Sequence, residues 1–178
     1  MKRTILLTFI TVLSITLVRS QVFHSAQTLK KGGFSLGVEP SVIVNGNESF
    51  YLFLHGGYGI KSGLDLALKF GVGNENYFGA DLEFAIKKNI SLTVGAHDFG
   101  SFGLDGALLF NIPIKSDLKL VTGLDMDINF PDEVELPLWL PIGLEVNLKK
   151  NMSLIFESEI GLTPPAYHFF GGGLAFYF

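Results

Sequence analysis

The sequence predicts an all-β protein, a closed antiparallel up-and-down barrel of about ten strands that spans a membrane. Three observations predict this fold. Apolar residues recur at every second position through most of the chain, turn residues divide it at regular intervals, and aromatic residues stand near both ends of many of the resulting segments. A period of two is typical of a strand with one apolar face. Eight or twelve strands are the alternatives.

The composition favours a membrane barrel over a soluble or nucleic-acid-binding domain. Hydrophobic residues make up 48% of the 178 residues, and charged residues only 17%, against roughly 25% in soluble domains. The formal charge of −4 argues against nucleic acid as a partner, because that binding needs a basic surface. Cysteine is absent, which excludes disulfides and thiolate metal sites. We expect no cofactor.

The N-terminus has the pattern of a cleavable signal peptide. Lys2 and Arg3 precede an apolar run of 14 residues, 5–18, which is shorter than the roughly 20 residues of a transmembrane helix. Cleavage is expected after Ser20, and an uncleaved anchor is the alternative. The predicted organisation is a signal peptide at 1–20, an N-terminal periplasmic segment at 21–32 and the β-barrel domain at 33–178.

Ten segments of the chain after the signal have the alternation of strands. In 64–72, for example, large apolar residues occupy the even positions and Asp65 and Lys69 the odd ones. Most segments suit the roughly 9–11 residues of a tilted transmembrane strand. The predicted strands are 33–44, 49–60, 63–73, 77–87, 90–98, 102–112, 117–130, 137–148, 151–162 and 167–178.

The connections between these segments alternate between two kinds. One set is short, with lysine in each member, and the other is more varied, such as 131–135 and 163–166. Transmembrane barrels have this asymmetry, with tight turns on the periplasmic side and longer loops outside. Strict alternation places both ends of the barrel on the tight-turn side. In two of these turns, Asn89 and Asn151 are expected to adopt the left-handed backbone that tight hairpins require.

Aromatic residues favour a membrane barrel over a β-sandwich. Phe50 and Tyr58 stand eight residues apart on one apolar face, as do Phe102 and Phe110. Eight strand residues span roughly 26 Å, or roughly 20 Å of depth when tilted, close to the apolar band of about 25 Å that aromatic girdles border in such barrels. A sandwich core has no reason to place rings at both strand ends. A soluble secreted sandwich stays as an alternative.

The opposite face carries the charged residues and is predicted to line the lumen. It holds ten acids against Lys69, Lys87 and Lys119. Buried charges must pair or be hydrated, and three lysines cannot neutralise ten carboxylates, so we expect either water in the lumen or some protonated carboxylates. A hydrated acidic lumen would favour cations, although a barrel of this size is mostly filled by its own side chains. The predicted lumen acids are Glu39, Asp65, Asp81, Glu83, Asp105, Asp125, Asp127, Glu145, Glu157 and Glu159.

A triplet of glycine, an apolar residue and an acid recurs about once per hairpin. It begins at Gly63, Gly79, Gly103, Gly123 and Gly143. With this spacing each glycine and its acid point inward, where glycine relieves crowding at a sharp bend. We interpret the repeat as structural rather than as a ligand site.

The C-terminal segment carries a family resemblance. Phe178 ends the chain, with Phe176, Leu174 and Phe170 on the same face. This resembles the terminal strand of bacterial outer-membrane proteins. The resemblance implies an outer-membrane location, lipid as the surrounding partner, and these four residues as the signal read by the barrel-assembly machinery. Gly172 departs from the pattern, where a larger apolar residue is usual, which weakens recognition.

The sequence gives little evidence of catalysis or metal binding. His97 is a weak catalytic candidate, because it stands beside Asp98 and is expected near the outer end of its strand. Omptin proteases, which are ten-stranded outer-membrane barrels, work with acidic residues and a His–Asp pair at the outer rim. Adjacent strand residues point to opposite faces, however, which favours a polar histidine of the lumen or the rim. His55 is expected to face the lumen alone. The histidines lack the close spacing of a metal site, and no metal is expected.

Three functions therefore compete. The first is a structural or interaction barrel, in the form of a narrow cation-favouring channel that admits small ions. The second is an outer-membrane enzyme that acts on lipid or peptide. The third is a soluble secreted binding module with a sandwich fold. The sequence favours the first.

Overall fold

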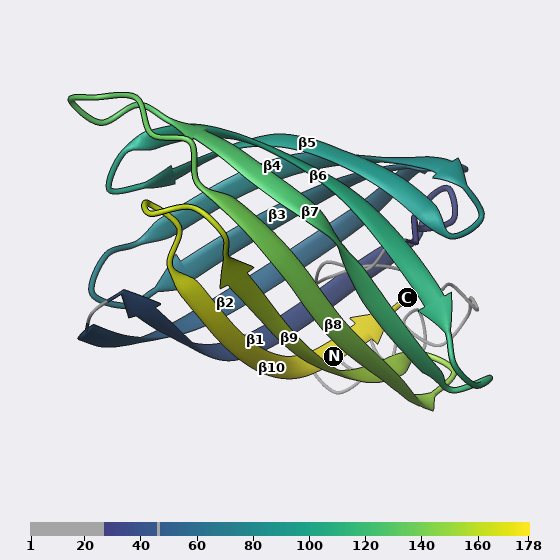
Figure 1. Cartoon of the computed structure of the whole chain (residues 1–178). Coiled ribbons are helices and arrows are strands. Elements are labelled where there is room, and N and C mark those ends of the chain that lie inside the picture. Colours follow the sequence, from purple (N-terminus) through teal and green to yellow (C-terminus); the bar gives the residue numbers. More distant parts are fainter. Residues whose placement is uncertain (1–26, 46) are drawn as a thin grey trace, which may run out of the picture.

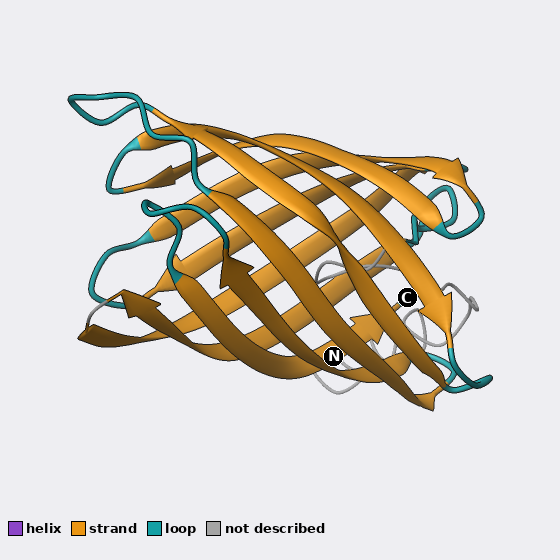
Figure 2. Cartoon of the chain, viewed as in Figure 1, coloured by secondary structure: helices purple, strands orange, loops and turns teal. Residues whose placement is uncertain are grey.

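The computed structural model describes residues 27–45 and 47–178, which form one closed barrel of ten antiparallel strands (Figure 1). Each strand pairs with its neighbours in chain order, and β1 closes the sheet against β10. Figure 2 shows only strands and loops in the described part. No helix in these residues is long and apolar enough to cross a membrane. The predicted all-β, up-and-down barrel is confirmed.

All ten predicted strands are confirmed, with ends that differ by at most two residues. The predicted signal peptide and most of the segment that follows it lie outside the described residues. The strands are β1 Phe34–Asn45, β2 Asn47–Lys61, β3 Leu64–Val72, β4 Tyr77–Lys87, β5 Ile90–Phe99, β6 Phe102–Pro113, β7 Leu118–Asn129, β8 Leu138–Lys149, β9 Met152–Gly161 and β10 His168–Tyr177.

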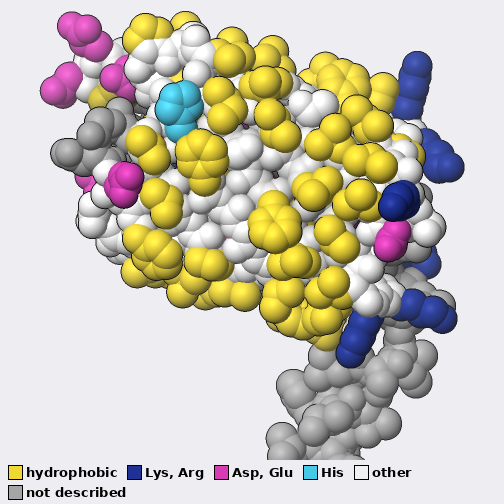
Figure 3. Space-filling view, turned by 60° about the horizontal axis from the view of Figure 1, so that its bottom comes forward, with side chains coloured by type: hydrophobic (Ala, Val, Ile, Leu, Met, Phe, Trp, Pro, Cys, Tyr) yellow, Lys and Arg dark blue, Asp and Glu magenta, His cyan; other side chains and the backbone are white. Residues whose placement is uncertain are grey.

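The two ends of the barrel differ in their connections. At the turn end lie the connections after β2, β4, β6 and β8, together with the start of β1 and the end of β10. At the loop end lie the other five, of which the connection between β7 and β8 is the longest. The predicted alternation is therefore confirmed. In Figure 3, Lys side chains gather at the turn end, and most of the visible Asp and Glu side chains lie at the loop end.

One parity rule holds around the whole barrel. Residues that face each other in an antiparallel pair share a face, and even-numbered residues pair with even ones, as in Leu68 with Ala80 and Ala80 with Ala96. The exceptions are the bulged pairs beside three turns, Lys61 with Leu64, Lys87 with Ile90 and Lys149 with Met152. The exposed large apolar side chains are consequently all even-numbered, and the buried polar ones all odd-numbered. A slip of one residue in any pair would bring charges to the outer face.

Large apolar side chains are exposed on the outer face of all ten strands and form an apolar belt, and Figure 3 shows the part of it on one side of the barrel. Phe50 and Phe102 near the loop end are 62% and 52% exposed, and Tyr58 near the turn end is 41% exposed. Apolar patches on soluble monomers rarely exceed a few hundred Å², so exposed large apolar side chains on all ten strands indicate a transmembrane barrel rather than a soluble one. The sandwich alternative is wrong, because the ten strands close into a single sheet whose apolar face points outward.

The tight turns differ from expectation in one respect. Among the described residues, positive φ occurs only at Gly32, Gly63 and Gly100, so the left-handed backbone expected at Asn89 and Asn151 is wrong. In both of their turns the strand register shifts just before the turn, as it does between Ala85 and Lys87. The extra residue of such a bulge helps the chain to reverse its direction at these turns without a left-handed residue.

Residues 27–32, which precede β1, cross the lumen at the turn end. Leu29 is 1% exposed, and its backbone N–H donates to the Asp65 carboxylate on β3. Across the barrel, the Lys119 Nζ on β7 donates to the Gln27 Oε1 at 3.0 Å. A Cβ at position 59 would lie 2.0 Å from the Lys30 carbonyl oxygen. Glycine at position 59 therefore lets the stretch pack against the wall.

Candidate functional site

All ten acids of the predicted lumen set lie on the inward, odd-numbered face of the strands. Eight are buried, with exposed fractions of 9% or less, and Asp81 and Asp105 are partly buried. Of the three lysines expected beside them, Lys69 and Lys119 lie in the lumen. The placement of Lys87 was wrong: it is exposed, because β4 has by then reached the turn and shifted register.

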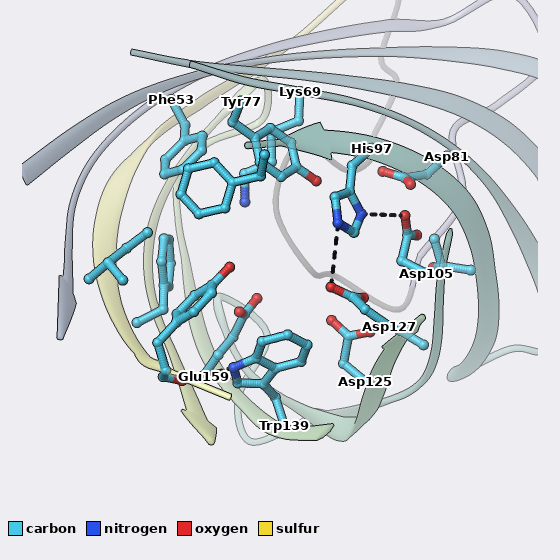
Figure 4. Close-up of a pocket in the computed structure, with 16 residues that line it drawn as sticks. Phe53, Lys69, Tyr77, Asp81, His97, Asp105, Asp125, Asp127, Trp139 and Glu159 are labelled. Carbon is cyan, nitrogen blue, oxygen red and sulfur yellow. Dashed lines mark hydrogen bonds and ion pairs between the residues drawn. The ribbon is translucent and has the colours of Figure 1, made fainter. Parts of the chain in front are cut away.

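Five of the acids line one cavity in the loop-end half of the lumen (Figure 4). Its volume of about 90 Å³ has room for several water molecules. One side is acidic and holds Asp81, Asp105, Asp125 and Asp127 from β4, β6 and β7, and β9 adds Glu159. The other side is aromatic. Its rings are Phe53, Tyr77, Phe99, Trp139, Tyr167 and Phe169.

His97 stands on the acidic side with both ring nitrogens facing acceptors. The Nδ1 lies 3.2 Å from the Asp105 Oδ2, and the Nε2 lies 3.1 Å from the Asn129 Oδ1 and 3.7 Å from the Asp127 Oδ2. Only the imidazolium form donates from both nitrogens, so this geometry favours a positively charged ring. Asp98 points away and is exposed. The His97 contacts are those of a charge-pairing lumen histidine rather than of a base beside a nucleophile.

The aromatic side is a chain of ring contacts that crosses the lumen. Phe99, at the end of β5, meets Tyr167, in the connection between β9 and β10 on the opposite wall, at a centroid distance of 6.3 Å. From Tyr167 the chain continues to Trp139 at 5.4 Å, and from Phe99 to Tyr77 at 5.8 Å. The Trp139 Nε1 also donates to the Tyr167 carbonyl oxygen at 2.8 Å. The rings are therefore held in fixed positions.

Tyr167 is the member of this chain that lies outside the strands. Burial raises the pKa of its phenol well above the usual value, and the Glu159 and Asp127 carboxylates raise it further. The phenol therefore stays neutral, so the aromatic side contributes rings and hydroxyls and no negative charge of its own.

Lys69 places its ammonium group against the rings. The Nζ lies 4.5 Å from the centroid of Phe53, 5.2 Å from that of Phe169 and 5.8 Å from that of Tyr77. A cation within about 6 Å of a ring centroid is attracted by the negative face of the ring. The aromatic side of the cavity thus stabilises positive charge as the acidic side does.

The aromatic half of the cavity is not predicted by the alternation of the sequence. The odd positions are expected to be polar, and the aromatic residues near strand ends are expected at even positions, on the outer face. The available signal was a set of aromatic residues at odd positions near the loop end of their strands, namely Tyr51, Phe53, Tyr77, Phe99, Trp139, Tyr167 and Phe169.

Two polar pairs occupy other parts of the lumen. His55, expected to stand alone, instead lies with its Nε2 2.8 Å from the Glu39 Oε2, because β1 and β2 bring their inward side chains together. Toward the turn end, the Lys119 Nζ donates to the Glu145 Oε2 at 2.8 Å, and the Ser153 hydroxyl donates to the other carboxylate oxygen at 2.8 Å.

Replacing Lys119 by methionine is expected to destabilise the barrel by about 3 kcal/mol, because removal of one partner leaves a buried carboxylate uncompensated. The pair is buried, with side-chain exposures of 7% and 5%. The measurement is the free energy of unfolding in urea in lipid vesicles. Lys88→Met, at an exposed turn position, is the control and should change it by less than about 0.5 kcal/mol. Equal effects would contradict a stabilising role for the buried pair.

The four residues of the predicted assembly signal lie on the closing strand or at its end. Phe170, Leu174, Phe176 and Phe178 are even-numbered and belong to the outer face. Phe178 also exchanges backbone hydrogen bonds with Phe34, at 2.8 Å and 3.1 Å. Their use by an assembly machinery stays a prediction.

Comparisons with known proteins give no family membership. No family model matches the chain, and no curated protein matches it. Three solved structures are similar at low identity. A de novo designed transmembrane β-barrel is 14% identical with a TM-score of 0.46, over 84% of this chain and 98% of that one. The N-terminal β-barrel domain of Pseudomonas aeruginosa OprF is 15% identical with a TM-score of 0.38, over 83% and 98%. The outer membrane protein OprG from Pseudomonas aeruginosa is 12% identical with a TM-score of 0.37, over 86% and 99%.

Fold and surface together define the class of this protein. A closed sheet of ten strands with an apolar exterior, a charged interior and polar ends is a small transmembrane β-barrel.

Proposed function

We propose that this barrel resides in a bacterial outer membrane and acts as a narrow conduit that favours small cations. The observation that carries the proposal is the charge of the loop-end cavity. Five carboxylates line it, against Lys69 and His97 as the cationic side chains of the lining. A cleft lined by one sign of charge and enclosed by low-dielectric walls concentrates counter-ions.

The orientation follows from the connections. In transmembrane barrels the longer loops face outside and the tight turns face the periplasm. The acidic cavity would then open toward the exterior, and the Lys-rich turn end would face the periplasm. Within this proposal the terminal residues from Phe170 to Phe178 serve the barrel-assembly machinery, and outer-membrane lipid surrounds the belt.

The lumen sets an upper limit on the size of the solute. Side chains fill much of a barrel of this strand number, and residues 27–32 cross the turn end. Solutes would therefore be small ions rather than folded or bulky molecules.

Ion selectivity in planar bilayers tests the channel. Across a salt gradient of potassium chloride, the reversal potential should show cation preference. The triple variant Asp105→Asn, Asp125→Asn, Asp127→Asn should lose most of it. The matched control is Asp98→Asn, Asp132→Asn, Glu133→Gln, which removes the same charge from exposed positions at the loop end and should keep most of the preference.

Three outcomes would remove the proposal: an electrically silent barrel, a preference for anions, or an equal loss of selectivity in both variants. The location is tested separately. Recovery in the outer-membrane fraction with heat-modifiable migration in detergent gels is expected, and quantitative recovery in the soluble fraction without detergent would contradict it.

A further inference from the structure

We infer that the loop-end cavity is a binding site for a short alkylammonium ion, with its charged head at Asp125 and Asp127 and its carbon chain against Trp139 and Tyr167. The inference deepens the proposed function, on which it rests, by naming the solute class that the acidic cavity prefers over inorganic cations. It stands on three features: the ring geometry, the placement of the acids and the volume.

The ring geometry shows that this wall already accommodates an ammonium group. Three rings surround the Lys69 Nζ at centroid distances of 4.5, 5.2 and 5.8 Å. Rings placed in this way recognise amines and methylated amines. The rings and acids of this cavity thus already hold one ammonium group of the protein itself, which shows the kind of charge that the lining stabilises.

The acidic and aromatic sides meet at one place, beside Trp139. Asp125 on β7 pairs directly with Trp139 on β8 in the strand register, so the two side chains leave the wall as nearest neighbours on the same face. The hydrogen bond to the Tyr167 carbonyl oxygen fixes the indole. In Figure 4 the Trp139 ring lies between Asp125 and Glu159. A ligand bound there would place its cationic head against the carboxylates and its methylene groups against the indole ring.

The volume limits the length of the ligand. The cavity, at about 90 Å³, is well below the roughly 300 Å³ at which pockets for drug-sized ligands begin. Only a chain of a few carbon atoms fits beside the Lys69 side chain. The Lys69 ammonium group already occupies the space between the three rings. A ligand with one positive charge would therefore bind at the acids, and a second positive charge on the ligand would be repelled by the lysine.

The mixed lining also argues for an organic cation over a bare inorganic one. Hard metal ions take six or more oxygen ligands, and aromatic rings supply none. In the described part of the chain, no three His, Asp or Glu side chains are grouped so that they could hold a metal ion. An alkylammonium ion uses both halves of the lining, because its head needs charge and its chain needs apolar contact.

Trp139 provides the measurement, since it is the one tryptophan in the sequence and it lines the cavity. The full chain, folded in detergent micelles, would be titrated at constant ionic strength with n-butylammonium chloride, n-butanol or potassium chloride. Tryptophan emission and isothermal calorimetry report binding. n-Butylammonium should saturate the emission change at concentrations at least tenfold lower than potassium, and n-butanol, which lacks the charge, should give no saturable change.

Two variants with opposite expected effects sharpen the test. Asp125→Asn with Asp127→Asn should raise the Kd for n-butylammonium at least tenfold. Lys69→Met should lower it several-fold, because it removes the competing cation and leaves the rings. The control Asp132→Asn with Glu133→Gln, in the connection between β7 and β8, should leave the Kd unchanged. Heat-modifiable migration verifies that each variant folds.

The outcomes separate this inference from the proposed function. Equal half-saturation by n-butylammonium and potassium would overturn the inference, as would unaltered binding in the Asp125 and Asp127 double variant. If the double variant does not fold, the comparison of ligands on the unaltered chain and the Lys69→Met titration still decide. Cation preference in bilayers without amine preference would leave the conduit standing and remove only the amine site.

Discussion

Replacing Leu108 by arginine is expected to lower the free energy of unfolding of the vesicle-embedded barrel by about 2–4 kcal/mol, the cost of a charged residue facing lipid at the bilayer midplane. Leu108 lies in the middle of β6, on the even-numbered face, and is 38% exposed. Its side chain belongs to the apolar belt, and a guanidinium group there has no polar partner. Urea unfolding of the barrel in phospholipid vesicles, followed by tryptophan emission, gives the value.

Ile114→Arg is the matched control for depth. Ile114 is 52% exposed and follows the end of β6 at the turn end, where the expected cost falls to about 0–1 kcal/mol. The difference between the two positions is the test. If both arginines were equally harmless, as on a water-exposed surface, the apolar belt would not be in contact with lipid.

Replacing Gly123 by alanine is expected to destabilise the barrel by about 3 kcal/mol or more, or to prevent folding, because it forces a methyl group against fixed backbone. A Cβ at this position would lie 2.1 Å from the Leu108 carbonyl oxygen and 3.0 Å from the Leu109 Cα. Neither atom belongs to a flexible side chain, so β6 and β7 would have to separate. The measurement is the same urea unfolding, with the folded fraction read from heat-modifiable migration.

Gly106→Ala on the neighbouring strand β6 is the control. The nearest atom to its added Cβ is the Thr93 carbonyl oxygen at 3.8 Å, an ordinary contact, so the expected change is within about 0.5 kcal/mol. A harmless Gly123→Ala would show that the strands can move apart at this point without cost. The recurrence of glycine before an acid would then lose its structural explanation at this position.

Not every member of the glycine triplet has the same cause, and here the sequence repeat is a poor guide. Glycine is needed at position 123 because the backbone of β6 lies too close for a side chain, whereas Gly63 adopts a φ of +80° in a turn. Gly103 leaves space for neighbouring side chains, since a Cβ there would meet the Asn129 Oδ1 at 2.3 Å and the His97 Nε2 at 2.4 Å. A similar local pattern thus meets three different physical demands, which depend on what the neighbouring strands bring to each position.

The sequence by itself determined the strands, their faces and the sign of the lumen charge. Side-chain direction alternates along a strand, so the positions of Asp105 and Leu108 within β6 already assign one to the interior and the other to the lipid. Local alternation and turn residues suffice for this. They do not reveal which inward residues meet across the barrel.

Only the tertiary structure decided which inward side chains contact one another. Closure of β1 on β10 brings Phe99 and Tyr167, far apart in the chain, into contact across the lumen, gives His55 its partner Glu39, and places the Lys69 ammonium among three rings. It also draws residues 27–32 into the turn end. The physical reason is that these contacts depend on strand order, stagger and tilt around a closed sheet, which no local periodicity encodes.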